Sequence, residues 1–237
     1  MGENIESAID NGRDYQRKGY RYSFDMLGRR PSPRSDAPYH LAYADAITEL
    51  SRHCKSRDVR LNPGISVKLS ALYPRYETTQ REAVLDNLFP SIRSLCLLAK
   101  KAGMGLNIDA EEAERLDLSL DIIEALVADK SLHGWHGLGV VVQAYGYRAP
   151  HVLDWLYALA QQHDAPDGAA GQGRLLGPRN QAQPGTGRRC LSGIHTQEQY
   201  RCQLPVLCRQ TAGPAFAHFP CATHNAHTLA AILATDR

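Results

Sequence analysis

The sequence predicts an α/β fold, a (β/α)8 TIM-type barrel in incomplete form, with a poorly ordered segment near residues 165–221. Up to about residue 163, short apolar runs typical of strands alternate with amphipathic helical patterns, as in a parallel sheet with right-handed crossovers. An open doubly wound sheet fits this order too, but no Gly-x-Gly-x-x-Gly follows any of the runs, which disfavours its dinucleotide-binding form. Polar residues at the strand ends favour a barrel, whose active site lies at the carboxyl ends of its strands.

Four apolar runs have the length and composition of buried strands. They are Arg21–Leu27, Ile65–Leu69, Gly105–Asp109 and Gly137–Gln143. The first is rich in aromatic residues and is closed by Gly28, and Pro63-Gly64 punctuates the chain before the second. The last is continuous in apolar residues, as expected of a parallel strand covered on both faces.

A helical pattern follows each of these strands. The apolar stripes that predict the helices are Tyr43, Ile47 and Leu50; Ile92, Leu95, Cys96 and Ala99; Leu116, Leu120, Ile123 and Val127; and Val152, Leu156 and Leu159. The first helix is expected over about 39–55. The second is expected to begin at Pro90, because proline is favoured in a first helical turn, and the fourth near Pro150.

The domain organisation follows from this order. The expected parts are a preceding helix within 1–19, strands one to four with their helices over 20–163, an anomalous segment over 164–221, and a remnant of a later strand–helix unit over 222–237. The anomalous segment contains no lysine, and four of the six cysteines fall in it or at its end. Glu198 is its only acid between Gly168 and Cys221.

Lys68 is the first candidate functional residue, because an unpaired ammonium inside an apolar strand would be costly. It is expected to bind a substrate carboxylate, to form a Schiff base, or to pair with Asp109 or Asp25 merely to satisfy the interior. Asp109 ends the third strand. Gln143 ends the fourth, where its amide can meet a cofactor ring or a neighbouring loop.

A Thr-His-Asn-Ala-His sequence at 223–227 holds the second group of candidates, Thr223 and His224. Such side chains bind a metal, a phosphate or a flavin. No third metal ligand is evident and no Cys-x-x-Cys is present, so we expect no metal site.

Length and charge fit a single domain that needs no charged partner. At 237 residues it suits one α/β barrel domain, and its net charge of +2 demands no acidic partner. No apolar run approaches the roughly 20 residues that span a bilayer, and the first residues do not resemble a signal peptide. We expect a cytoplasmic protein that touches the inner membrane at most peripherally.

A further signal lies in five longer segments. They are Tyr20–Gly28, Gly64–Tyr76, Asn107–Glu112, Val142–Tyr145 and Ala222–Ile232. In this order they resemble the proline dehydrogenase family, in the form found in bacterial bifunctional proline utilization proteins. The resemblance covers nearly all of 15–163 and 222–232. It implies a distorted (β/α)8 barrel that binds FAD and oxidises L-proline to Δ1-pyrroline-5-carboxylate in proline catabolism.

The resemblance also implies roles for single residues. Lys68 pairs with the proline carboxylate, and Asp109 lies beside the substrate and keeps the catalytic face in order. Gln143 contacts the flavin, and Thr223 and His224 line the FAD site. Hydride passes from proline C5 to flavin N5, and the reduced flavin then delivers electrons to a membrane quinone. The nucleic-acid-binding module that full-length family members often carry is not seen in these residues.

A shifted reading frame accounts for the anomalous segment. One permitted set of codons for Asp167–Gly177, read one base later, encodes MVRLVKGAYW, and this contains the Arg-Leu-Val-Lys-Gly-Ala-Tyr-Trp motif that grips the flavin in the family. The residues from Leu191 to Pro205 are recoded in the same register to another family-like run. As written, the chain lacks the flavin-gripping strand and ends before the last barrel units. We therefore expect weak FAD binding and little turnover of proline.

Two other functions compete with this one. The first is a non-enzymatic fragment whose basic, disordered segment binds nucleic acid, although its arginines lack aromatic interleaving and helical spacing. The second is an aldolase that forms a Schiff base at Lys68.

Overall fold

The structure is a computed structural model, and it describes residues 2–20, 22–26, 38–144, 146–162, 174–176 and 221–222. The chain divides into two compact units, Met1–Gly139 and Val140–Arg237, and each is described by itself. In the described part of the chain, no helix is both long enough and apolar enough to cross a bilayer.

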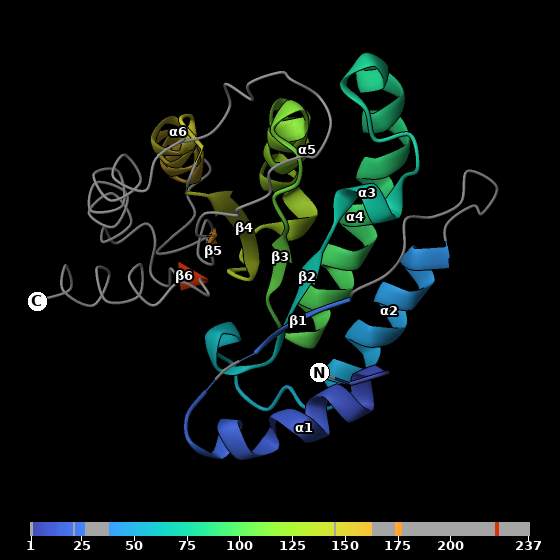
Figure 1. Ribbon diagram of the computed structural model, residues 1–237, viewed down its shortest axis with the longest axis vertical. Helices are drawn as coiled ribbons and strands as arrows, with labels where there is room; N and C mark the ends of the chain where they lie inside the picture. Colours follow the sequence, from blue (N-terminus) through green and yellow to red (C-terminus); the bar gives the residue numbers. More distant parts are fainter. Residues whose placement is uncertain are drawn as a thin grey trace, which may run out of the picture. The chain divides into compact units, whose positions relative to one another are not determined.

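The first unit is built around three parallel strands, β1 (Ser23–Asp25), β2 (Gly64–Val67) and β3 (Leu106–Ile108). Phe24 lies opposite Ile65, and Ile65 lies opposite Leu106. The strands lie side by side in Figure 1, and every residue of β2 and β3 is buried. Strand and helix alternate along the chain, so the predicted α/β class with a parallel sheet is confirmed.

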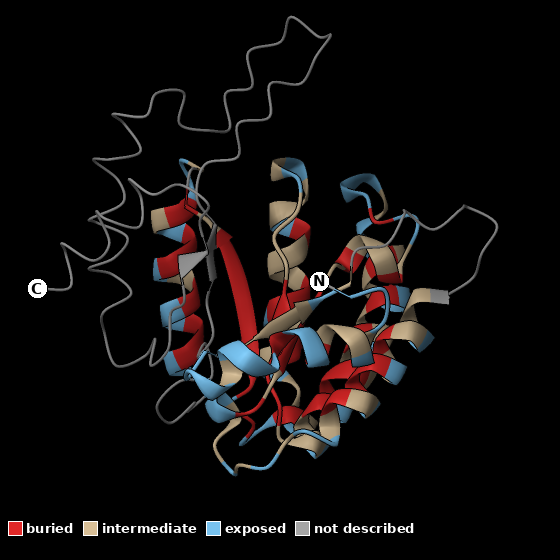
Figure 2. Cartoon of the chain, turned by 60° about the horizontal axis from the view of Figure 1, so that its bottom comes forward, coloured by how far each residue is buried: buried red, intermediate tan, exposed pale blue. Residues whose placement is uncertain are grey.

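Helices surround these strands. They are α1 (Ile5–Arg17), α2 (Pro38–Ser51), α3 (Leu69–Leu72), α4 (Arg81–Ala102) and α5 (Leu116–Ala128), with 3-10 turns η1 (Val59–Leu61), η2 (Thr78–Gln80), η3 (Ala113–Arg115) and η4 (Lys130–Leu132). Their inward faces and the strands make up the buried core (Figure 2). The predicted stripe of α2 is confirmed, since Tyr43, Ile47 and Leu50 are each no more than 2% exposed.

Two helix predictions are corrected by the structure. Pro90 does not begin a helix but lies inside α4. The apolar stripe extends upstream of it to Val84 and Leu88, both fully buried, and this packing outweighs the ~3 kcal/mol that an interior proline costs a helix. In α5 the buried residues are Leu118, Ile122, Ile123 and Leu126. Of the predicted stripe, Ile123 is buried as expected, whereas Leu116, Leu120 and Val127 are half-buried, because leucine and isoleucine occur on more than one side of this helix.

The amino-terminal edge of the first unit is held together by side chains that bond to the backbone. Asn62 is 6% exposed and uses its whole amide: Nδ2 donates to the carbonyls of Ser56 and Gly103, and Oδ1 accepts from the backbone N–H groups of Lys55 and Ser56. The indole N–H of Trp135 donates to the Met104 carbonyl at 3.1 Å. These bonds fix the segments that lead into β2 and β3.

An ion pair between Arg93 of α4 and Asp129 closes the same edge. Asp129 also accepts the backbone N–H of Ser131 at 2.8 Å. The Arg93 hydrogen bond, chiefly, lowers the pKa of Asp129 from 3.8 to about 2. A carboxylate with a lowered pKa stabilises the fold above its unfolded pKa and loses this effect as the pH falls through its folded pKa.

We therefore expect Asp129→Asn to destabilise the protein by about 1 kcal/mol at neutral pH, because water around the half-exposed Arg93 screens the pair. The asparagine still caps Ser131, so only the charge is lost. The two proteins should converge in stability between about pH 4 and about pH 2. Urea unfolding followed by circular dichroism across this range measures the difference, and a constant gap at every pH would contradict the assignment.

The second unit contains β4 (Leu138–Gln143, of which the first two residues belong to the first unit), α6 (Ala149–Gln162), β5 (Arg174–Leu176) and β6 (Cys221–Ala222). β4, β5 and β6 pair in parallel, with Val142 opposite Leu175 and Leu176 opposite Ala222. The predicted stripe of α6 is confirmed, since Val152, Leu156 and Leu159 are buried.

The strand β5 corrects the expectation that a fifth strand is missing. It lies in the segment for which the sequence predicted poor order, and it pairs in parallel with β4 and β6. The other residues of 164–220 lie outside the described residues, so the frameshift and the poor order of that segment stay predictions.

Candidate active site

The candidate site lies at the carboxyl ends of β1, β2 and β3. Asp25 is the last residue of β1, Lys68 directly follows β2, and Asp109 directly follows β3. Lys68 is thus not inside the strand, as the sequence suggested, but is the residue before α3. Because the strands are parallel, their carboxyl ends meet at one edge of the sheet, and three charged side chains come together there.

These side chains form an ion triad of Asp25, Lys68 and Asp109. The Lys68 Nζ donates to Asp25 Oδ1 at 2.6 Å and to Asp109 Oδ2 at 2.9 Å. The side chains are 35% exposed for Lys68, 32% for Asp25 and 15% for Asp109. The pairing of Lys68 with both aspartates, which the sequence offered as alternatives, is therefore confirmed, and the lysine still reaches solvent.

The two carboxylates keep Lys68 charged. Burial is the largest single influence on the pKa of Lys68 and lowers it, but the attraction and hydrogen bonds of Asp109 and Asp25 together outweigh burial and raise the pKa. Because folding raises the pKa of Lys68, its ion pairs make their full contribution to stability at any pH below the ordinary lysine pKa of 10.5. A nucleophilic lysine needs a lowered pKa, so this geometry disfavours the Schiff-base aldolase.

Tyr43 supports the triad from α2, and sequence reasoning assigned it only to the core. Its hydroxyl oxygen accepts the backbone N–H of Lys68 at 3.3 Å, and its side chain is 1% exposed. Burial raises its pKa, so the hydroxyl is neutral and adds no charge beside Asp25 and Asp109. The sequence does contain a signal for this contact, namely a tyrosine on an apolar helical stripe. A buried tyrosine hydroxyl usually has a hydrogen-bond partner, so a polar contact at Tyr43 could have been expected.

A second polar cluster stiffens the loop after β2. Glu111 Oε1 accepts the backbone N–H of Ser70 at 2.9 Å. Arg115 pairs with Glu111 and Glu112 and lies over the ring of Tyr76, with 5.4 Å from its Cζ to the ring centroid. Tyr76 is 2% exposed. The loop that begins with Lys68 is therefore anchored to the residues after Asp109.

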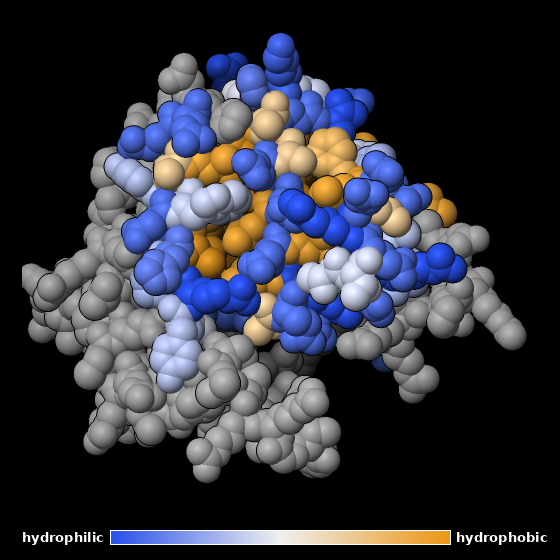
Figure 3. All heavy atoms as spheres, turned by 90° about the horizontal axis from the view of Figure 1, so that it is seen from above, coloured by the Kyte–Doolittle hydropathy of each residue, from blue (hydrophilic) through white to orange (hydrophobic). Residues whose placement is uncertain are grey.

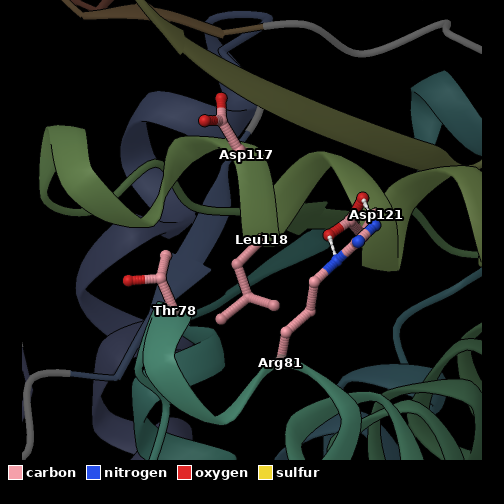
Figure 4. Close-up of a pocket in the computed structure, with 5 residues that line it drawn as sticks. All are labelled: Thr78, Arg81, Asp117, Leu118 and Asp121. Carbon is pink, nitrogen blue, oxygen red and sulfur yellow. Dashed lines mark hydrogen bonds and ion pairs between the residues drawn. The ribbon is translucent and has the colours of Figure 1, made fainter.

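A hollow of about 310 Å³ lies elsewhere on the first unit, between η2 and α5. Figure 4 shows Arg81 reaching across to Asp121 of α5, to which it donates two hydrogen bonds of 2.7 Å. Thr78, Asp117 and Leu118 complete the lining. None of these residues belongs to the triad. In the space-filling view, hydrophobic residues show between hydrophilic ones on the face that is turned forward (Figure 3).

The remaining predicted residues belong to the rest of the chain. Gln143 ends β4 and is the only residue of that strand that is not buried. Thr223 and His224 lie outside the described residues. The residues present fit a flavin as far as they are described: a strand-end amide that can both donate and accept is what a flavin ring edge needs.

The comparisons with known proteins point in one direction. The sequence model of the family described as Proline dehydrogenase matches residues 8–169. The bifunctional protein PutA of Salmonella typhimurium is 39% identical over 240 residues, which is 98% of this chain and 18% of that protein. PutA of Rhizobium meliloti is 42% identical over 243 residues, again 98% of this chain and 19% of the relative. The chain thus spans about a fifth of the length of these curated relatives.

Solved structures of PutA proteins also resemble this chain. A crystal structure of bifunctional proline utilization A has a TM-score of 0.76 at 37% identity and covers 99% of this chain and 24% of that chain. PutA from Bdellovibrio bacteriovorus, inactivated by N-propargylglycine, has a TM-score of 0.78 at 19% identity, with 99% of this chain and 26% of that chain covered; it supports the fold alone. With a strand-end ion triad, a matching family model and relatives at about 40% identity, this chain belongs to the proline dehydrogenase family.

Proposed function

We propose that this chain carries the substrate-holding part of an FAD-dependent proline dehydrogenase, which oxidises L-proline to Δ1-pyrroline-5-carboxylate in proline catabolism. The observation that carries the proposal is the ion triad. An ammonium, kept charged by two carboxylates and still 35% exposed, stands at the carboxyl ends of parallel strands. This is where a barrel enzyme binds its substrate.

Lys68 is suited to the carboxylate of proline. Its ammonium has three N–H groups, and Asp25 and Asp109 accept two of them. The third can make a charge-assisted hydrogen bond to a substrate carboxylate. The backbone N–H of Lys68 is held by Tyr43, so the start of the lysine side chain is fixed while its end meets the ligand.

Asp109 and Asp25 orient that lysine from two sides, and Asp109 is the more buried of the two. In the proposed complex Asp109 lies beside the proline ring and excludes water from that side. FAD, when bound, supplies the two-electron acceptor that the reaction needs, and Gln143, Thr223 and His224 are its proposed contacts. A quinone at the inner membrane is the proposed final acceptor, reached by a cytoplasmic protein that binds the membrane peripherally.

The turnover of this chain is proposed to be low. The residues 164–221 do not contain the Arg-Leu-Val-Lys-Gly-Ala-Tyr-Trp motif that the family resemblance assigns to the flavin. Without it, FAD should be held weakly, although the triad is intact.

The test compares the chain as written with a repaired chain in which residues 167–176 are replaced by MVRLVKGAYW. Each is purified with added FAD and mixed with L-proline under anaerobic conditions, and the flavin absorbance and the dye-coupled electron output are followed. We expect weak FAD retention and output near background for the chain as written, and a clear gain of both for the repaired chain. A chain as written that is yellow and reduces the dye with proline would refute the proposed impairment. A repaired chain that binds FAD but does not bleach with proline would refute the proposed activity.

A further inference from the structure

A second polar layer lies one step below the ion triad. This layer consists of Ser23 on β1, Ser66 on β2 and Asn107 on β3. Each of them lies two positions before one member of the triad. Residues two apart on a strand point to the same face, so this hydroxyl–amide layer and the ion triad share one face of the sheet. Such interior layers of barrels are usually filled by branched apolar side chains.

The hydroxyl–amide layer ties the outer two strands together across the middle one. Asn107 Nδ2 donates to Ser23 Oγ at 3.0 Å, and Ser23 Oγ and Ser66 Oγ lie 3.1 Å apart. Asn107 lies opposite Ser66 in the register and Ser23 opposite Gly64, so a side chain of β3 contacts β1 over β2. This contact requires that the three strands curve toward the shared face.

Asn107 is buried, and only the Nδ2 end of its amide is hydrogen-bonded within the described part of the chain. It is 4% exposed, and its Oδ1 has no hydrogen-bond partner in the described part of the chain. The equally buried Asn62 uses both ends of its amide in four bonds. Burying an unpaired carbonyl oxygen is destabilising, and an apolar residue of similar shape would avoid this loss. An asparagine at position 107 therefore needs a reason other than stability.

We propose that Asn107 is a positioning residue for the substrate site: through Ser23 it sets the spacing of Asp25 and Asp109, and so keeps the Lys68 ammonium on both carboxylates. Asp25 and Asp109 lie two residues beyond the two ends of the Asn107–Ser23 bond. If this bond is removed, β1 and β3 move relative to each other, and Lys68 no longer holds both partners at 2.6 and 2.9 Å. The consequence for substrate binding rests on the proposed function, whereas the geometry of Lys68 does not.

The test replaces Asn107 by leucine in the chain as written and follows the lysine ammonium groups by ¹H–¹⁵N NMR at low temperature. We expect the ammonium of Lys68 to exchange slowly with water only while both carboxylates hold it. We expect N107L to raise this exchange rate by roughly 10-fold or more and to weaken L-proline binding by roughly 10-fold, while the melting temperature stays the same or rises. Lys100, whose Nζ donates to the carbonyls of Ser131 and His133 at 2.9 and 2.7 Å, is the internal control and should not change.

Ser23→Ala removes the acceptor of the same bond and guards against an effect peculiar to leucine. It should produce the same loss of the slow Lys68 ammonium while Lys100 is unchanged. Unchanged Lys68 exchange in either folded variant would overturn the proposal, and so would a joint loss of the Lys68 and Lys100 signals with a lower melting temperature, since that would indicate a purely structural role. Because the Lys68 spectrum needs neither FAD nor turnover, a failure of the proposed oxidation would leave this result readable.

Discussion

Lys68→Met should reduce the affinity for L-proline by roughly 100-fold or more at neutral pH. The variant loses a charge-assisted hydrogen bond worth about 1.5–3 kcal/mol. It also leaves Asp25 and Asp109 without their shared cation, so these carboxylates repel the carboxylate of the substrate. Methionine keeps the length of the side chain, which makes the loss of charge the main change. Titration calorimetry on the chain as written measures the affinity, and flavin bleaching in the repaired chain measures the turnover.

The same variant should be less stable than the parent by about 2 kcal/mol, because removing one partner of a partly buried ion cluster leaves like charges together. Lys101→Met is the matched control: it makes the same change at an exposed position of α4. Undiminished proline binding in Lys68→Met, with normal binding in the control, would remove the basis of the proposed function.

Asp109→Asn should separate binding from turnover. The ion triad carries one positive and two negative charges, so neutralising Asp109 makes the site more favourable for a carboxylate. We expect the affinity for proline to be kept or to rise a few-fold, while kcat in the repaired chain falls by roughly 100-fold because the substrate and Lys68 are no longer held in register.

Asp25→Asn provides the comparison for Asp109→Asn, since it removes the same charge from the more exposed partner of Lys68. It should share the gain in affinity but lose less turnover, because Asp25 is not proposed to lie beside the reacting ring. Equal losses of turnover in the two variants would show that Asp109 has no special place in the site. A loss of proline affinity in both would show that the carboxylates act only by keeping Lys68 charged.

Local patterns in the sequence were sufficient to predict most of the framework. The alternation of apolar strands and amphipathic helices gave β2, β3 and β4 to within two residues, and the cost of an unpaired ammonium led to both partners of Lys68. These features depend on short-range periodicity and on simple charge balance. Lys68 lies after β2, directly before α3. The point at which β2 ends depends on where its hydrogen bonds to the neighbouring strands stop, and the periodicity of apolar residues does not reveal this point.

Features that depend on contacts between distant parts of the sequence could not be predicted from local patterns. The Asn107–Ser23 bond joins residues 84 positions apart and exists only because three strands curve toward one face. The helix α4 runs through Pro90 because the buried side chains on both sides of the proline stabilise the helix more than the low helix propensity of proline destabilises it. The short β5 lies in a segment whose composition argued against any strand. Thr223 and His224 lie outside the described residues, and their role in binding FAD stays a prediction.

The bonds of Asn62 and Trp135 bear on how this protein can evolve or be redesigned. They hold the amino-terminal edge of the sheet through hydrogen bonds to backbone carbonyls, whereas the carboxyl-terminal edge carries the charged side chains of the ion triad and of the Glu111–Arg115 cluster. We therefore expect substitutions to be tolerated unevenly: variants selected for a different substrate would accumulate changes around α3 and η3, and libraries that leave the amino-terminal edge unchanged would yield the larger share of folded clones.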